Sequence, residues 1–114
     1  MGLAMEFVLQ PDGEVEGSFG GSEILEGYPG LLHGGIIAAL LDGAMTNCLF
    51  AHGVQALTAE LTVRYRHPVA SHRRMIVRAA RVESHGVLHL IRAELMQDGC
   101  VKATARGKFI ENHE

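Results

Sequence analysis

One carboxylate stands alone within a long apolar stretch of the sequence. Asp42 is the only acidic residue between His33 and His52, in a segment rich in Ala, Leu and Met. Burying an unpaired carboxylate costs several kcal/mol, and Asp is a mediocre helix former. A functional use of the carboxylate would explain its presence. The alternative is a structural acid, paired to an arginine or lying at a solvated opening.

A glycine pair precedes this stretch, in the tripeptide His33-Gly34-Gly35. The first turn of a helix presents free N–H groups with a partial positive charge, and glycines let a ligand approach the backbone closely. This combination suits an oxyanion or a polarised carbonyl; a plain glycine turn is the alternative. Nine residues separate His33 from Asp42, about 13 Å along one helix. A site shared across a dimer, with Gly34 from one chain and Asp42 from its partner, would solve this separation.

Other polar residues are candidates for supporting roles. Thr46 lies one helical turn after Asp42, on the same face. Thr58 and Glu60 fall on the polar face of the next predicted strand, where Thr58 could hold a water or the Asp42 carboxylate and Glu60 could be a second acid. Arg73 and Arg74 are candidates for holding a phosphorylated ligand, although solvated arginines are commoner. The remaining histidines and cysteines show no metal-ligand spacing, so no metal is expected.

The elements that must position these residues follow from hydrophobic periodicity and turn signals. The pattern predicts short strands at 5–10 and 14–19 around Pro11-Asp12-Gly13, and then a glycine-rich connection over 20–32. One helix follows, from His33 to His52, with Gly53 just past its end. Beyond it the pattern predicts strands at 57–65, ended by Pro68, at 73–84 and 87–97 around Gly86, and at 101–109 after the turn signal Asp98-Gly99.

The predicted helix is apolar on every side, whereas a surface helix has a polar face. With only one helix, its cover must be the sheet, with a second subunit as a possible addition. The sequence therefore predicts an α+β fold, a curved antiparallel sheet wrapped around one central helix. Copies are expected to join edge to edge, because an open sheet leaves unpaired edge strands.

Length and composition limit the class of protein. The chain has 114 residues, the size of one domain, so we expect a single domain over 1–114. The net charge is −3 and argues against a nucleic-acid partner. Cys48 and Cys100 do not suggest a disulfide framework, which favours a reducing, cytoplasmic location. We expect no signal peptide, transmembrane helix or membrane association.

The segment Leu32-His33-Gly34-Gly35-Ile36-Ile37-Ala38-Ala39-Leu40-Leu41-Asp42 resembles the signature of hotdog-fold acyl-CoA thioesterases of the PaaI-like group. The following strand, Thr58 to Tyr65, closed by Pro68, matches the same group, and the resemblance covers about residues 27 to 109. It implies a homodimer with a continuous sheet, often a dimer of dimers, and active sites at the dimer interface. It implies no cofactor, and it gives the substrate as an acyl-CoA.

The resemblance also implies roles for individual residues. Asp42 would act as general base on water, or as nucleophile through an anhydride. The Gly34 amide would bind the thioester oxygen as it becomes an oxyanion, and Thr58 would orient the water. His33 would position the loop. As the second residue of the glycine pair, Gly35 is expected to lie beside the substrate.

One departure from the family pattern leaves alternatives open. Many relatives have an Asn six residues before the motif histidine, and here that position is Gly27. A non-catalytic protein that binds acyl groups or acyl-CoA is therefore the second hypothesis. A dehydratase of the same fold is the third, although its usual His and acid arrangement is not found.

Overall fold

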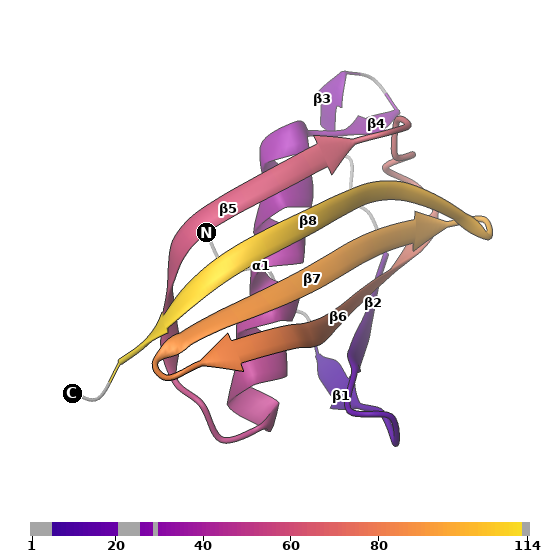
Figure 1. Ribbon diagram of the computed structural model, residues 1–114. Helices are drawn as coiled ribbons and strands as arrows, with labels where there is room; N and C mark the ends of the chain where they lie inside the picture. Colours follow the sequence, from indigo (N-terminus) through magenta and orange to yellow (C-terminus); the bar gives the residue numbers. More distant parts are fainter. Residues whose placement is uncertain (1–5, 21–25, 29, 113–114) are drawn as a thin grey trace.

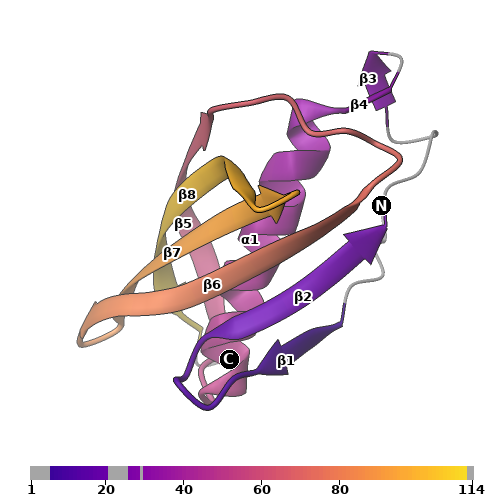
Figure 2. The same ribbon diagram turned by 90° about the vertical axis from the view of Figure 1, so that its right-hand side faces the viewer.

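A curved antiparallel sheet wraps around one long helix, α1 (Gly34–Ala51), in the computed structural model, which describes residues 6–20, 26–28 and 30–112 (Figure 1, Figure 2). The predicted α+β architecture is confirmed. The sheet has the order β1-β2-β6-β7-β8-β5, and all neighbouring strands are antiparallel. Its strands are β1 (Phe7–Leu9), β2 (Val15–Gly20), β5 (Ala56–Tyr65), β6 (Arg74–His85), β7 (Leu88–Gln97) and β8 (Cys100–Glu111).

The helix begins and ends close to where the sequence predicts. His33 is the N-cap, with extended backbone, and its side chain accepts a hydrogen bond from the Gly35 N–H. His52 is the C-cap, and Gly53 follows with a φ of 82°, a conformation that glycine adopts without strain. The capping residues therefore fix both ends of α1.

The core lies between α1 and the concave face of the sheet. The helix contributes buried residues that include Leu41, Met45 and Cys48, and the strands contribute others that include Leu95 and Phe109. By length and composition alone α1 could span a membrane, a test that the core helix of a soluble protein also passes.

The sheet does not cover the helix on every side, contrary to a literal reading of its apolar composition. Thr46 and Asn47 are exposed, and Phe50 is 64% exposed. One face of α1 is therefore left open in a single chain.

The turns follow the sequence signals. Asp98 and Gly99 have φ values of 54° and 74°, the two positive values that a two-residue hairpin turn of type I′ requires.

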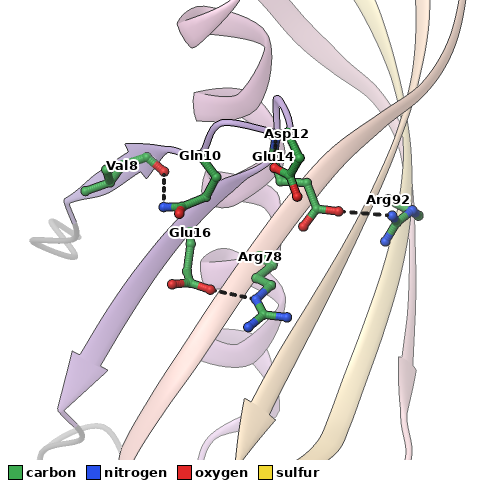
Figure 3. A network of polar contacts seen from close by, with 7 residues as sticks. All are labelled: Val8, Gln10, Asp12, Glu14, Glu16, Arg78 and Arg92. Carbon is green, nitrogen blue, oxygen red and sulfur yellow. Dashed lines mark hydrogen bonds and ion pairs between the residues drawn. The ribbon is translucent and has the colours of Figure 1, made fainter.

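Ion pairs join the β1–β2 hairpin to the neighbouring strands β6 and β7, as Figure 3 shows. Glu16 pairs with Arg78 at 2.6 Å, and Glu14 pairs with Arg92 at 3.3 Å.

The predicted glycine-rich connection over 20–32 contains more structure than expected. Two short strands, β3 (Glu26–Tyr28) and β4 (Leu31–Leu32), pair in a separate sheet beside the start of α1 (Figure 1). Gly27 lies in β3, at a register irregularity. Residues 21–25 and 29 lie outside the described residues. Strands this short carry too few residues for periodicity to reveal them.

Candidate active site

Asp42 lies in the middle of α1 and is hydrogen-bonded to the first strand after the helix. The Thr58 hydroxyl donates to Asp42 Oδ1 at 2.8 Å. Asp42 is half-buried and Thr58 is exposed. The sequence prediction that Thr58 could hold the Asp42 carboxylate is therefore confirmed, and the bond fixes one carboxylate oxygen while the other stays available.

Thr58 reaches the helix because β5 is irregular. Thr58 lies opposite Phe109 on the helix-facing side, whereas Glu60 lies opposite Lys108 on the outer side, with a register shift between them. In a regular strand, residues two apart share one face; a β-bulge breaks that rule by inserting one extra residue. The prediction that Thr58 and Glu60 share a polar face is wrong for this reason. Leu57, on the outer side before the bulge, is 64% exposed.

The start of α1 presents one backbone donor without a partner. The Gly35 N–H donates to His33 Nδ1 at 2.9 Å, and the Ile36 N–H donates to the His33 carbonyl at 3.0 Å. The Gly34 N–H has no hydrogen-bond acceptor within the part of the chain that the structure describes. The first turn therefore leaves one N–H, that of Gly34, for a ligand oxygen.

A pocket of about 670 Å³ opens beside this turn. Tyr65, at the end of β5, donates its hydroxyl to the Gly34 carbonyl at 2.8 Å and so holds the turn against the sheet. The residues that line the pocket are mostly apolar, with two histidines and an arginine: Leu31, Leu32, His33, Gly34, Ile37, Tyr65, Arg66, His67, Pro68 and Val69. The contribution of Tyr65 was not predicted from the sequence, although its alternation with Leu61 and Val63 places it on the helix-facing side of β5.

The two principal candidates do not meet within one chain. Gly34 and Asp42 are eight residues apart on one straight helix, about 12 Å along its axis. The pocket beside Gly34 is lined by neither Asp42 nor Thr58. A single chain therefore holds two halves of the predicted site at separate positions.

Of the other predicted site residues, one lies near Asp42 and three lie elsewhere on the molecule. Thr46 is exposed one turn after Asp42. Glu60 is 3.9 Å from Lys108, on the outer side of the sheet. Arg73 pairs with Asp98 at 3.3 Å, and Arg74 donates to the Ser18 hydroxyl at 2.8 Å. Arg73 is thus engaged at the β7–β8 turn, and Arg74 is engaged with β2.

The cysteines take no part in this arrangement. Cys48 is fully buried, and desolvation raises its thiol pKa from the ordinary value of 9.0, against a smaller opposing effect of Arg81. A raised pKa keeps the thiol protonated and unreactive.

Within residues 6–20, 26–28 and 30–112, no group of His, Cys, Asp and Glu side chains is arranged to hold a metal ion.

A curved six-stranded antiparallel sheet wrapped around one long helix is the hotdog fold. A model of the Thioesterase superfamily matches residues 29–104, and the chain belongs to that family. The acyl-coenzyme A thioesterase THEM4 of Bos taurus is 35% identical over 71 residues, which are 60% of this chain and 29% of that protein. The chain thus spans less than a third of this curated relative.

Solved structures share the fold over nearly the whole chain. A protein of Ralstonia eutropha, described as phenylacetic acid degradation-related, has a TM-score of 0.82 and 22% identity, over 94% of this chain and 83% of that one. A thioesterase protein of Streptococcus pneumoniae, solved with coenzyme A, has a TM-score of 0.88 and 16% identity, over 96% of this chain and 89% of that one. These structures thus show the hotdog fold for this chain.

Proposed function

We propose that this protein hydrolyses acyl-CoA thioesters to a carboxylate and free CoA. The observation that carries the proposal is the Asp42 carboxylate, fixed by the Thr58 hydroxyl at 2.8 Å in a chain of the Thioesterase superfamily. The relative from Bos taurus is named an acyl-coenzyme A thioesterase, and the Streptococcus pneumoniae structure contains coenzyme A. Two further structures of that protein carry an Asp and a Thr replaced by Ala at positions sixteen residues apart, the separation of Asp42 and Thr58.

Asp42 would activate the attacking group. As a general base, its free oxygen removes a proton from water while the water oxygen bonds to the thioester carbon. The C–S bond then breaks, and the CoA sulfur leaves with a proton. As a nucleophile, Asp42 would instead form an anhydride that water hydrolyses. A single turnover in ¹⁸O-water tests the second route, because ¹⁸O enters the Asp42 side chain when water attacks the Asp42 carbonyl of the anhydride, whereas the first route leaves that side chain unlabelled.

The Gly34 N–H would stabilise the oxyanion, supplied by a second copy of the chain. β5 is one of the two edges of the six-stranded sheet, and its ten residues make it far longer than β1 at the other edge. A long open edge favours pairing with another strand. We therefore propose a homodimer joined along β5, in which Gly34 of one chain meets Asp42 of the other. A dimer of dimers would be a further assembly of the same unit.

The first test is thiol release from a panel of short, medium, long and aromatic acyl-CoAs. The comparison is between the unaltered protein, Asp42→Asn, and Asp12→Asn as the matched control. Asp12 accepts a hydrogen bond from the Glu14 N–H in the β1–β2 turn, away from α1. General base catalysis contributes about 10²–10⁴-fold, so we expect Asp42→Asn to lose at least 100-fold in kcat. Equal turnover by all three proteins would remove Asp42 from the mechanism.

A complementation experiment tests the shared site. Gly34→Pro removes the backbone N–H, and proline is favoured at the first helical position. The preceding residue, His33, already has the extended backbone that proline requires, with φ −62° and ψ 135°. Coexpressed Asp42→Asn and Gly34→Pro chains would form mixed dimers with one intact site. Recovered turnover supports a site shared between chains, and inactive mixed dimers would place both groups in one chain.

The non-catalytic alternative has its own outcome in the same experiments. Gly27, in β3, stands where many relatives have an Asn. Folded protein that binds acyl-CoA tightly and releases no thiol from any substrate would identify a binding protein.

A further inference from the structure

A second hydrogen-bonded set of side chains lies at the β6–β7 hairpin, on strands other than the one that carries Thr58. Ser84 Oγ is 2.6 Å from His89 Nδ1, and His89 Nε2 is 2.7 Å from Glu111 Oε1. The residues come from β6, β7 and β8, three neighbouring strands. A hydroxyl, an imidazole and a carboxylate are thus joined in series.

The hydrogen bonds of the three groups decide which ring nitrogen of a neutral His89 carries the proton. An ionised carboxylate accepts hydrogen bonds and donates none, so the Glu111 bond places the proton of a neutral His89 on Nε2. Nδ1 then carries a lone pair and accepts the Ser84 O–H. His89 is 4% exposed and the Glu111 side chain 23% exposed, whereas Ser84 is exposed. The buried base therefore faces an accessible hydroxyl.

We propose that Ser84 is an activated nucleophile that reacts with small activated esters, with His89 as its general base and Glu111 as a positioning residue. A nucleophile bonded to a base that a third group orients is the arrangement that serine hydrolases use on unrelated folds. Because Ser84 lies open at a hairpin, little binding energy is available, which favours esters with good leaving groups, such as aryl esters of short carboxylic acids.

This set is separate from the Asp42 region. The pairings Thr58–Phe109, Phe109–His89 and His89–Ser84 form one row across the helix-facing side of the sheet. Neighbouring strands are about 4.8 Å apart, so Ser84 lies about 14 Å from Thr58. Phe109, fully buried, stands between them. The reactivity of Ser84 therefore goes beyond the proposed acyl-CoA hydrolysis and does not depend on it.

The chemical step is a transfer of the acyl group to Ser84. Ser84 Oγ bonds to the ester carbonyl carbon as its proton moves to His89 Nδ1. The bond from carbon to the leaving oxygen breaks, and the departing phenol takes the proton from His89. An ester on Ser84 remains, and water attacks it with His89 again as base. The carboxylic acid is released and the Ser84 hydroxyl is restored.

The test is acetylation of the full-length protein by p-nitrophenyl acetate, with the modified residues located by peptide mass spectrometry. Ser18 is the internal control, an exposed serine whose hydroxyl is bonded to Arg74 and not to a histidine. We expect Ser84 to acquire the acetyl group about 100-fold faster than Ser18, the usual contribution of a general base. Acetylation of both serines at the same rate would overturn the proposal.

Variants assign the roles within the set. Ser84→Ala should abolish the acetylated hairpin peptide, and His89→Gln should slow its formation about 100-fold. An unchanged rate in a folded His89→Gln protein would exclude His89 as the base. Circular dichroism establishes the folding of each variant.

The proton position gives a readout that needs no variant at His89. In the unaltered protein, ¹⁵N NMR of the His89 ring should show the proton on Nε2 at neutral pH. Glu111→Gln should give a mixture of both tautomers and slower acetylation, and Glu111→Asp should restore the Nε2–H form. A proton on Nδ1 in the unaltered protein would contradict the proposal.

Discussion

Two hydroxyl groups on the same row of the sheet have different partners. Thr58 donates to the Asp42 carboxylate of α1, whereas Ser84 is bonded to the imidazole of His89, which is bonded to Glu111. A hydroxyl bonded to a carboxylate orients that acid and leaves the acid to act on water. A hydroxyl bonded to a buried imidazole is itself poised to lose its proton. The same residue chemistry thus supports the acid in one region and becomes the reactive group in the other.

The burial of the acid explains part of this difference. Asp42 is half-buried on the helix, on the side that the sheet leaves partly open. In the second region the histidine is the buried member, 4% exposed, and the serine is exposed. In both regions the residue that carries the hydroxyl is exposed, and the regions differ in the burial of its partner, which is the half-buried Asp42 in the first and the buried His89 in the second.

Removing the side chain that separates the two regions should destabilise the folded protein. Phe109 is fully buried between Thr58 and His89, and replacing a buried Phe by Ala costs about 3–5 kcal/mol. We expect Phe109→Ala to lower the free energy of unfolding by that amount, measured by urea denaturation. Phe109→Leu should cost less. An effect below about 1 kcal/mol for Phe109→Ala would mean that the neighbouring residues refill the space.

Deleting one backbone donor should abolish most of the activity of the first region and leave that of the second unchanged. Gly34→Pro removes the proposed oxyanion donor, a change that costs about 100- to 1000-fold in kcat in enzymes that use such donors. We expect that loss in thiol release from acyl-CoA, with Ser84 acetylation unchanged. Gly34→Ala is the control, because it keeps the N–H and its Cβ would meet the Tyr65 ring at an ordinary 3.6 Å. Equal losses in both variants would point to crowding and not to the N–H.

Changing the Thr58 hydroxyl tests the support given to Asp42. Thr58→Val keeps the shape and removes the donor, and a hydrogen bond to a charged group contributes about 1.5–3 kcal/mol. We expect kcat for acyl-CoA to fall by about 10- to 100-fold, since each 1.4 kcal/mol is about tenfold. Thr58→Ser should retain most of the activity. If Thr58→Val turned over acyl-CoA at the original rate, the bond would have no role in catalysis.

The smallest expected effect concerns Cys48, a buried thiol that should be unreactive in the folded protein. Burial raises its thiol pKa, so a thiol reagent should modify Cys48 only after unfolding. A thiol whose pKa is higher in the folded state than in the unfolded state contributes stability that is fully present below the unfolded pKa and is lost as pH rises from there through the folded pKa. We expect the free energy of unfolding to decline above about pH 9, less steeply in Cys48→Ala. Rapid modification of Cys48 in the folded protein would contradict this.

Local patterns predicted the elements well and the contacts less well. The apolar stretch with His33 and Gly53 at its ends gave α1 to within one residue, and Asp98-Gly99 gave its hairpin turn. The strands β3 and β4 were too short for periodicity. The bulge before Glu60 escaped detection because the residues around it alternate regularly in type, so the strand looks uniform from the sequence.

Local patterns in the sequence are enough to predict that a lone acid lies in an apolar helix, that a glycine pair opens this helix, and that antiparallel strands cover it. These features are local, since they depend on propensity, periodicity and turn chemistry. The tertiary structure was needed to show that Thr58 reaches Asp42 and that Ser84, His89 and Glu111 meet. Such contacts join residues of different helices and strands, and they depend on strand register, where a shift of one residue moves a side chain to the opposite face.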